Sequence, residues 1–198
     1  MRKASSREKI LKAASELFHE RGFQQTSVDE IVEKSKVTKS NFYYHFKSKE
    51  ELALEILDAR IKNFEEDFIS SVLKNPSIPP AQRLENFYKR VEKLHQSLNC
   101  RKGCPFGNLA IEMSDLNEKF RIRLSRFFKS WESALENCVR EGIERGEFRK
   151  DIDPKLIASL ILSQIEGAIM MVKTHKTTEP IKEGAKAIIN LILTKEAA

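Results

Sequence analysis

The sequence predicts an all-α protein, with a small three-helix domain at the N-terminus and a larger helical domain after it. Apolar residues recur with the helical period along nearly all of the 198 residues, and no segment alternates as a strand would. Three helix-capping patterns fall within the first 50 residues, and the composition changes near residue 50. We therefore expect residues 1–50 and 51–198 to form separate domains.

The first helix is predicted over about residues 6–21. Ser5 and Glu8 form a capping box, in which the serine hydroxyl caps a free amide and the glutamate reaches back to the serine amide. Gly22 is expected to end this helix in the left-handed conformation, which glycine adopts at little steric cost. The apolar face of the helix carries Ile10, Ala14, Leu17 and Phe18.

Two short helices separated by a tight turn are predicted next. A second capping box at Ser27 opens a helix with an apolar inner face. Residues 35–37 make the turn, and Thr38 caps a third helix that runs to about His45. This arrangement is typical of a helix-turn-helix motif, whose second helix enters the major groove of DNA.

Helix breakers divide the remainder of the chain. A third capping box, Ser48 with Glu51, opens a long helix over about residues 49–74, and a proline-rich loop at 75–80 ends it. A second loop rich in breakers is predicted over 100–107, and Asp153-Pro154 starts a late helix after the stop at Gly146. The remaining helices are predicted over about 80–98, 108–115, 117–145, 154–175 and 180–195, which gives eight or nine in all.

The charge distribution favours an anionic partner for the N-terminal domain. The chain carries a formal charge of +6, and residues 1–50 hold 11 Lys/Arg against 7 Asp/Glu. Three cysteines are too few for a disulfide framework, so we expect a reducing, cytoplasmic location. The most apolar run, Leu156 to Val172, is interrupted by polar residues and is interpreted as a buried or interfacial helix, so no membrane partner is expected.

The third helix presents polar and basic residues on one face, spaced i, i+3, i+4 and i+7. Short polar side chains near its start allow a close approach to base edges, while tyrosine hydroxyls and lysine ammoniums suit phosphate oxygens. Plain core aromatics and an ordinary solvated lysine face are the alternative interpretation. The predicted DNA contacts are Thr26, Ser27, Lys36, Thr38, Lys39, Ser40, Asn41, Tyr43, Tyr44, His45, Lys47 and Lys49.

At this point the chain resembles a known family. Phe23-Gln-Gln-Thr-Ser-Val-Asp-Glu-Ile, followed by Lys36-Val-Thr-Lys-Ser-Asn-Phe-Tyr-Tyr-His-Phe-Lys-Ser-Lys-Glu-Glu-Leu52, is similar to the N-terminal domain of the TetR/AcrR transcriptional repressors. The similarity is dense over about residues 7–55. It implies a recognition helix from Thr38 to His45 and a double-stranded DNA operator as partner. The family often has Gly in place of Ser40 and Thr in place of Asn41, so the operator sequence does not carry over.

The resemblance also implies a C-terminal domain that dimerises and binds a small-molecule effector. The residue pattern also favours dimerisation, because the last two predicted helices carry apolar residues on more faces than the core of one chain readily buries. We therefore predict a homodimer through these two helices; burial within one chain is the alternative.

Aromatic, methionine and polar residues at helical spacing are the candidates for the effector pocket. Each of these residue types is also typical of a plain helical core, but together they suit an apolar or aromatic effector. The predicted ligand-binding residues are Phe64, Phe68, Phe87, Cys104, Phe106, Asn108, Met113, Phe127, Trp131, Gln164 and Met170, with Glu166 as a further polar anchor.

The segment from Gly103 to Asp115 is similar to an electrophile-responsive subgroup of the family, in which Gly-Cys precedes a Glu-x-Ser-Asp helix. Cys104 lies just before a predicted helix start, with Arg101 and Lys102 close in sequence, and both features favour a reactive thiolate. The alternative is a buried structural thiol. A metal site made by His95, Cys100 and Cys104 has irregular spacing, so no metal is predicted.

The combined prediction is a homodimeric, ligand-responsive transcriptional regulator, most simply a repressor, that needs no cofactor. An enzyme is not predicted, because no nucleophile–His–carboxylate order, phosphate-binding loop or carboxylate pair is present. A DNA-organising protein of the same fold, with no ligand response, is the alternative.

Overall fold

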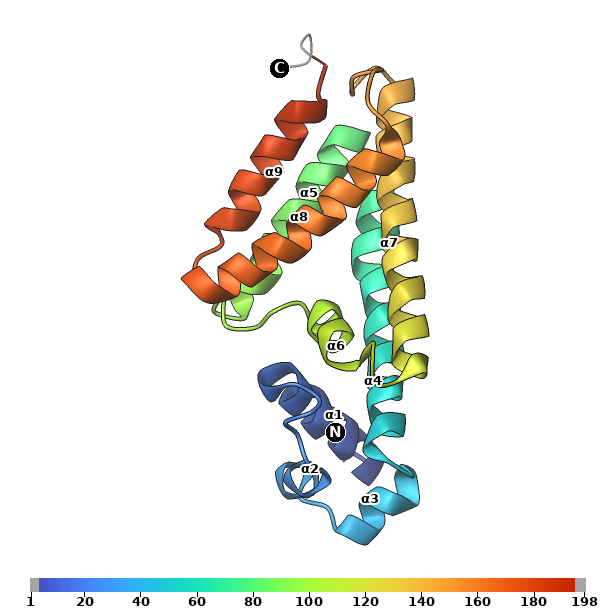
Figure 1. The fold of residues 1–198 in the computed structure, drawn as a ribbon, viewed down its shortest axis with the longest axis vertical. Helices are drawn as coiled ribbons and strands as arrows, with labels where there is room; N and C mark the ends of the chain where they lie inside the picture. The colour runs from blue at the N-terminus through green and yellow to red at the C-terminus, as the bar shows by residue number, and fades with distance from the viewer. Residues whose placement is uncertain (1–3, 195–198) are drawn as a thin grey trace. The chain divides into compact units, whose positions relative to one another are not determined.

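The computed structural model describes residues 4–194 and confirms the all-α fold class (Figure 1). Within these residues there are nine α-helices and one π-helical segment, and the sole extended pairing is an isolated bridge between Phe148 and Leu193. The chain forms two compact units. Among the described residues, the first comprises residues 4–62 together with 105–124, and the second comprises residues 63–104 together with 125–194.

The first unit is built on the three N-terminal helices α1 (Ser6–Arg21), α2 (Val28–Ser35) and α3 (Lys39–His45), which pack against one another. Their apolar faces meet the first turns of α4 (Lys49–Phe64) in one buried core. The members of this core are Ile10, Ala14, Leu17, Ile31, Phe42, Phe46, Leu52 and Ile56.

The predicted caps are present for the first two helices and partly for α4. The Ser5 hydroxyl accepts from the Glu8 amide at 3.2 Å, and the Glu8 carboxylate accepts from the Ser5 amide at 2.7 Å. At the third box the Ser48 hydroxyl caps Glu51, but the Glu51 carboxylate accepts from the Lys47 amide instead of the Ser48 amide. Only half of the third box therefore forms.

Gly22 ends α1 at a positive φ, but not in the predicted left-handed helical conformation. Its angles are φ 91° and ψ 165°. This is extended backbone of the mirror-image kind, which is essentially restricted to glycine. The left-handed residue of this region is instead Lys36, which ends α2 at φ 56° and ψ 41°.

The long helix predicted over residues 49–74 has the expected extent but two different geometries. The α-helix α4 ends at Phe64, and the π-helical segment η1 (Glu65–Leu73) continues it. A π-helix is wider than an α-helix, because its hydrogen bonds span five residues, as in the 2.9 Å bond from the Lys74 amide to the Ile69 carbonyl. The hydrophobic period cannot predict this change.

Helix α6 (Pro105–Met113) belongs to the first unit, together with the start of α7 (Glu118–Glu144). The sequence predicted this helix from residue 108 and placed it in the C-terminal domain. Its earlier start is explained by Pro105, because proline is favoured in the first turn of a helix, where no amide hydrogen is needed.

The second unit contains α5 (Pro80–Ser97), α8 (Pro154–His175) and α9 (Glu179–Ile192), with α9 against both of the others (Figure 1). Gly184 of α9 permits a close crossing, since a Cβ atom there would lie 1.6 Å from the Gln164 side-chain nitrogen. The Gln164 carbonyl oxygen accepts from the Tyr88 hydroxyl at 3.0 Å. Gln164 thus joins three helices, so it serves the packing of this unit.

Arg83 is a buried cation of the second unit that the sequence did not single out. Only 2% of the residue is exposed, and its guanidinium donates to both carboxylate oxygens of Glu141, at 2.6 and 3.0 Å. It also donates to the Ile78 carbonyl at 2.6 Å, which fixes the loop before α5. The hydrogen bonds from Arg83 lower the pKa of Glu141.

In the described part of the chain, α8 is the one helix long and apolar enough to cross a membrane by length and composition. Its inner face is buried in the second unit through Ile157, Ala158, Ile161, Ile165 and Val172. Burial of this face is typical of the core helix of a globular domain.

Candidate DNA-binding surface and effector region

The helix-turn-helix geometry follows from local backbone chemistry. Ser27 caps α2 by accepting from the Glu30 amide at 3.2 Å, and Thr38 caps α3 by accepting from the Asn41 amide at 3.2 Å. Lys36 takes the left-handed conformation between the two helices, so the chain reverses within three residues. Phe42 is fully buried and fixes the rotation of α3 about its axis.

The outer face of α3 carries side chains with the chemistry that phosphates and bases require. Tyr44 is 83% exposed and Tyr43 is 50% exposed, although both are large aromatic residues. Lys36, Ser40 and Lys47 are exposed on the same motif. Two exposed tyrosines on one short helix are unusual for a soluble surface and point to a binding face.

Lys39 is also exposed but already has a partner. Its ammonium lies 2.7 Å from the Asp29 carboxylate, and the hydrogen bond that Lys39 donates to Asp29, together with the negative charge of Asp29, raises the pKa of Lys39. Both side chains are more than half exposed, so the pair is solvent-screened. A phosphate can therefore replace Asp29 as the partner of Lys39 at small cost.

Two predicted DNA contacts do not lie where the sequence placed them. Thr26 is 1% exposed, and its hydroxyl donates to the Gly22 carbonyl at 2.8 Å. The ammonium of Lys49 donates to the backbone carbonyls of Phe23 and Thr26, at 2.9 and 2.8 Å, and lies 4.2 Å from the centre of the Phe23 ring. The predicted phosphate role is wrong for Thr26, and the described contacts of Lys49 are structural.

Asn41 and His45 occupy intermediate positions on α3. The side-chain oxygen of Asn41 is buried and has no hydrogen-bond partner among the described residues. Because that atom makes no hydrogen bond, turning the amide towards a base edge breaks none. His45 packs edge-on against the Tyr44 ring, with centroids 5.0 Å apart, and so limits the positions that Tyr44 can take.

The predicted effector residues divide into two groups, one in each unit. In the second unit five aromatic rings pack against one another, with Phe64 in contact with three of them. The Phe64 ring lies 4.8 Å from Phe68, 5.2 Å from Phe127 and 4.7 Å from Trp131. Phe87 completes the cluster at 5.7 Å from Trp131. We call these five residues the aromatic cluster.

Four of the five rings of the aromatic cluster are buried, and the cluster holds an unsatisfied polar group. Trp131 is 2% exposed, and its indole nitrogen has no hydrogen-bond partner among the described residues. An unpaired buried N–H costs about 1–3 kcal/mol, so its presence in a core calls for an explanation. A ligand atom that accepts a hydrogen bond would satisfy it.

A second polar group of this unit pairs Cys104 with Glu166. The thiol is buried and hydrogen-bonds the Glu166 carboxylate. Burial raises the pKa of Glu166, and one of its oxygens has no hydrogen-bond partner. The burial of Cys104 agrees with the alternative of a buried structural thiol, and its hydrogen-bond partner is an acid, whereas the sequence suggested nearby cations.

His95 fixes the loop before Cys104. It is 3% exposed and hydrogen-bonds the backbone of Lys102, while burial lowers its pKa. Among the described residues, no group of three or more His, Cys, Asp or Glu side chains could hold a metal ion, and this includes His95, Cys100 and Cys104.

The remaining predicted effector residues lie elsewhere. Phe106 and Met113 are buried on α6 in the first unit, with Asn108 between them. Met170 is 58% exposed on the outer side of α8, so its predicted place in an interior pocket is wrong. The helical spacing did not indicate which face of α8 carries Met170, because the apolar residues of α8 lie on more than one face.

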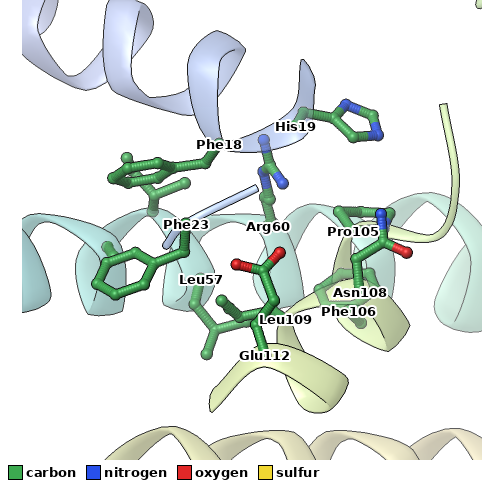
Figure 2. A pocket seen from close by; sticks show the side chains of 12 residues that line it. Phe18, His19, Phe23, Leu57, Arg60, Pro105, Phe106, Asn108, Leu109 and Glu112 are labelled. Atoms are coloured by element: carbon green, nitrogen blue, oxygen red, sulfur yellow. The ribbon is translucent and has the colours of Figure 1, made fainter. Parts of the chain in front are cut away.

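A crevice in the first unit lies between α1, α4 and α6 (Figure 2). Phe18, Phe23, Leu57 and Leu109 line it with apolar surface, and the Glu112 carboxylate projects into its middle (Figure 2). Its volume of about 30 Å³ is room for little more than one water molecule. A larger groove of about 300 Å³ lies in the second unit between α5 and α9, bordered by charged residues of both helices.

Glu112 is the residue of this region that the sequence prediction missed. Its carboxylate accepts from the Gln24 amide at 2.9 Å, across 88 residues of sequence. The Glu-x-Ser-Asp pattern contains this residue, but nothing in the pattern indicates the partner.

Residues 80–188 match the tetracyclin repressor-like C-terminal domain, and residues 10–56 match the N-terminal model of the bacterial regulatory proteins of the tetR family. The first match alone spans more than half of the chain. The chain belongs to the TetR family. It is thus a regulator of transcription that binds DNA through its helix-turn-helix, and α2 and α3 lie inside the N-terminal match.

Individual TetR family members are similar over nearly the whole chain. The HTH-type transcriptional repressor DhaR of Mycobacterium sp. (strain GP1) is 30% identical, with 98% of this chain and 95% of DhaR covered. The HTH-type transcriptional regulator YxaF of Bacillus subtilis (strain 168) is 32% identical, with 98% of each chain covered. A TetR regulatory protein of Rhodobacter sphaeroides has a similar crystal structure, with a TM-score of 0.88, 26% identity, and 96% and 100% of the two chains covered.

Proposed function

We propose that this protein is a cytoplasmic, homodimeric repressor that leaves a palindromic DNA operator when a small molecule binds its second unit. The observation that carries the proposal is the outer face of α3, where two exposed tyrosines lie on a short, capped helix and the exposed Lys47 follows its end. Such a helix fits the major groove, with Tyr43, Tyr44 and Lys47 at phosphates and Ser40 and Asn41 at base edges.

The outer side of α8 supports dimerisation. Leu156, Leu160 and Met170 are 66%, 43% and 58% exposed and recur along one side of the helix. Gly167 lies in the same stripe, and a Cβ atom there would meet nothing within 4 Å, so another helix can approach closely. With Leu191 of α9, 50% exposed, the stripe forms an apolar surface that a second copy of the chain would cover. Two copies would place two recognition helices in successive major grooves about 34 Å apart.

The aromatic cluster is the proposed effector site. An aromatic ligand with one hydrogen-bond acceptor would pack against the rings and accept from the indole N–H of Trp131. Glu166, whose free oxygen is an acceptor, would receive a donor from the same ligand. The effector class is therefore an aromatic molecule that carries both an acceptor and a donor, and the cluster must open by rotation of its rings to admit it.

A reactive Cys104 stays a narrower proposal. Modification of the thiol would break its hydrogen bond to Glu166, so the effect would resemble that of an effector that takes Glu166 as its partner. Because the thiol is buried, we expect modification to be slow in the absence of opening. Mass spectrometry after mild electrophile treatment would have to find Cys104 modified before Cys100 and Cys138 for this role to stand.

Genomic footprinting tests the DNA function. Protection of one or two palindromic promoter sites is expected, and protection of many unrelated sites with no ligand response would instead indicate a DNA-organising protein. For base contacts, Asn41→Ala should relax sequence preference at defined positions of the operator, whereas Tyr43→Ala should weaken binding to all DNA sequences alike. Unchanged sequence preference in Asn41→Ala would contradict the base contact.

The single tryptophan provides a direct test of the effector site. Ligands from a panel of aromatic acids, amides and phenols should quench the fluorescence of Trp131 and lower operator affinity together. Trp131→Phe keeps an aromatic ring but lacks the N–H, so it should bind an active ligand about tenfold more weakly while operator affinity without ligand stays unchanged. Equal ligand affinity in both proteins would remove Trp131 from the site.

A further inference from the structure

The groove between α5 and α9 has an aliphatic floor. The two helices pack against each other in the second unit, and the groove between them has a volume of about 300 Å³. Ile181, Ala185 and Ile189 recur at every fourth residue of α9, so they lie in one row along the helix. Ile181 and Ile189 are buried, and Ala185 is half-buried. We call these three residues the aliphatic row; it offers carbon surface and no hydrogen-bonding side chain.

Tyr88 of α5 also lines the groove, and its polar atom already has a partner. The residue is 2% exposed, and its hydroxyl donates to the Gln164 side-chain oxygen at 3.0 Å. Burial raises the pKa of Tyr88, so the hydroxyl stays neutral at any physiological pH. An occupant of the groove therefore meets the aliphatic row and an uncharged aromatic ring.

The border of the groove carries one positive charge in excess, since three lysines and two glutamates line it. Lys182 of α9 lies 3.6 Å from the Glu92 carboxylate of α5, so this ion pair joins the two helices. Lys89 lies 3.1 Å from Glu85, which is one turn earlier on α5. Lys186 is exposed and has no carboxylate partner among the described residues. The excess charge is thus the ammonium of Lys186, beside the aliphatic row.

We propose that this groove is a second small-molecule site, and that its ligand is a straight-chain aliphatic carboxylate. The alkyl chain lies along the aliphatic row, and the ammonium of Lys186 binds the carboxylate. The row is about 12 Å long, at 1.5 Å of helix rise per residue. An extended chain covers about 1.2 Å per bond, so a carboxylate of roughly eight carbons fits beside the row.

The size and charge of the groove favour this ligand over other occupants. Its volume lies at the lower end of the range for small-molecule sites, which is about 300–1,000 Å³. A peptide helix is about 10–12 Å wide with its side chains, which is too large for a groove of this volume. A cationic amphiphile would bring a further positive charge to a border that already has one in excess. A chain with one terminal anion uses both the aliphatic row and Lys186.

The groove is separate from the aromatic cluster, because none of the five residues of that cluster lines it. The inference therefore goes beyond the proposed function and does not depend on it. A ligand in the groove is recognised by a flexible chain and one negative charge, whereas the proposed effector is an aromatic molecule with a hydrogen-bond acceptor and a donor. Each site can thus be tested without the other.

Titration of the isotope-labelled protein with sodium octanoate, followed by NMR of its amide signals, tests the site. The backbone amides of Ala185 and Ile189 should shift and reach saturation, whereas the indole signal of Trp131 in the aromatic cluster should not move. Hexanoate should bind at least fivefold more weakly, because each fully buried methylene contributes about a factor of four and the groove is open on one side. If no signal saturates, or if the shifts are confined to the Trp131 indole, the proposal is wrong.

Octylamine tests the sign of the charge, because it has the same chain length as octanoate and a positive head. It should bind at least fivefold more weakly than octanoate, since Lys186 attracts one head and repels the other. Octylamine that binds as tightly as octanoate would overturn the assignment of a carboxylate ligand.

Lys186→Gln tests the anchor, with Lys173→Gln as the matched control. Both lysines are exposed in the second unit, but Lys173 is on α8 and does not line the groove. The two variants lose the same charge, so an unspecific attraction of anions falls equally in both. Lys186→Gln should weaken octanoate binding about threefold, and Lys173→Gln should leave it unchanged. An equal effect of the two variants would show that only net charge attracts octanoate, which overturns the site.

Ala185→Leu tests the aliphatic row, because a larger side chain at this position fills the groove. This variant should lose the saturable octanoate shifts at Ile189 while its thermal unfolding, followed by circular dichroism, stays cooperative. Octanoate binding of wild-type strength in the folded variant would place the ligand elsewhere and refute the proposal. If Ala185→Leu does not fold, Lys186→Gln still decides, because its side chain is exposed and has no described partner.

Discussion

Lys49 provides the sharpest test of the difference between a structural lysine and a DNA-binding one. We consider Lys49→Met, which keeps the length of the side chain and removes its charge. The ammonium makes two charge-assisted hydrogen bonds, to the carbonyls of Phe23 and Thr26, and one contact with the Phe23 ring. Lys47→Met is the matched control, because Lys47 is exposed two residues earlier, on the connection between α3 and α4.

The magnitude follows from these contacts. Hydrogen bonds to a charged group contribute roughly 1.5–3 kcal/mol each, and an exposed cation–π contact contributes about 0.5–1 kcal/mol. The lower ends of these ranges add up to about 3.5 kcal/mol, and because Lys49 is half-buried and water can reach the freed carbonyls in the variant, we expect a loss of about 2 kcal/mol. For a chain of this size that corresponds to a fall in melting temperature of roughly 4–8 °C.

Thermal unfolding by circular dichroism and operator binding at several salt concentrations separate the two roles. Lys49→Met should lower the melting temperature and leave the salt dependence of operator binding unchanged. Lys47→Met should leave the melting temperature unchanged and reduce the slope of log affinity against log salt by about 0.9 for each recognition helix. If Lys49→Met instead lowers the slope without a loss of stability, its ammonium binds phosphate on DNA, and the structural assignment is refuted.

The other predictions concern three positions. Glu141→Gln should destabilise the protein by about 2 kcal/mol at pH 7, because the buried Arg83 loses its charged partner while Glu141 itself is partly exposed. The pKa of Glu141 is lower in the folded protein than its ordinary value of 4.5. The stabilisation is therefore fully present above pH 4.5 and is lost as the pH falls through the lower pKa of the folded protein. Denaturant unfolding from pH 7 to pH 3 should show this loss in the wild type and not in Glu141→Gln. Gly184→Ala should cost about 1–3 kcal/mol in the same assay, because its methyl group meets the Gln164 amide, and an unchanged midpoint would mean that α9 shifts freely. Tyr44→Ala should weaken operator binding without loss of stability, since the ring is 83% exposed, and equal binding in an anisotropy titration would remove it from the DNA face.

Local sequence patterns predicted the DNA-binding motif well, because its determinants act over three or four residues. The caps at Ser27 and Thr38 and the buried position of Phe42 can all be inferred from neighbouring residues, and the structure contains each of them. The prediction at Ser48 failed in part for an equally local reason, because the Glu51 carboxylate accepts from the amide of Lys47 and not from that of Ser48. A capping pattern identifies the helix start but not every hydrogen bond within it.

The candidate effector region was less predictable, because its residues meet only through long-range packing. Phe64, Phe87 and Trp131 come from three different helices, and their helical period does not indicate that they share one cluster. The same period placed Met170 inside, although it is exposed. The unpaired indole N–H of Trp131 has no sequence signal, since it depends on which groups are absent around the ring.

The sequence by itself determined the all-α fold, the helix-turn-helix and the family, because helix periods, caps and the residues of α3 are local properties. Only the tertiary structure decided that Lys49 binds backbone carbonyls, that Cys104 faces an acid, and that α6 belongs with the N-terminal helices. These three results depend on contacts between residues far apart in the chain. Whether a charged or polar side chain faces solvent or a distant carbonyl is fixed by the packing of whole helices, which no short stretch of sequence contains.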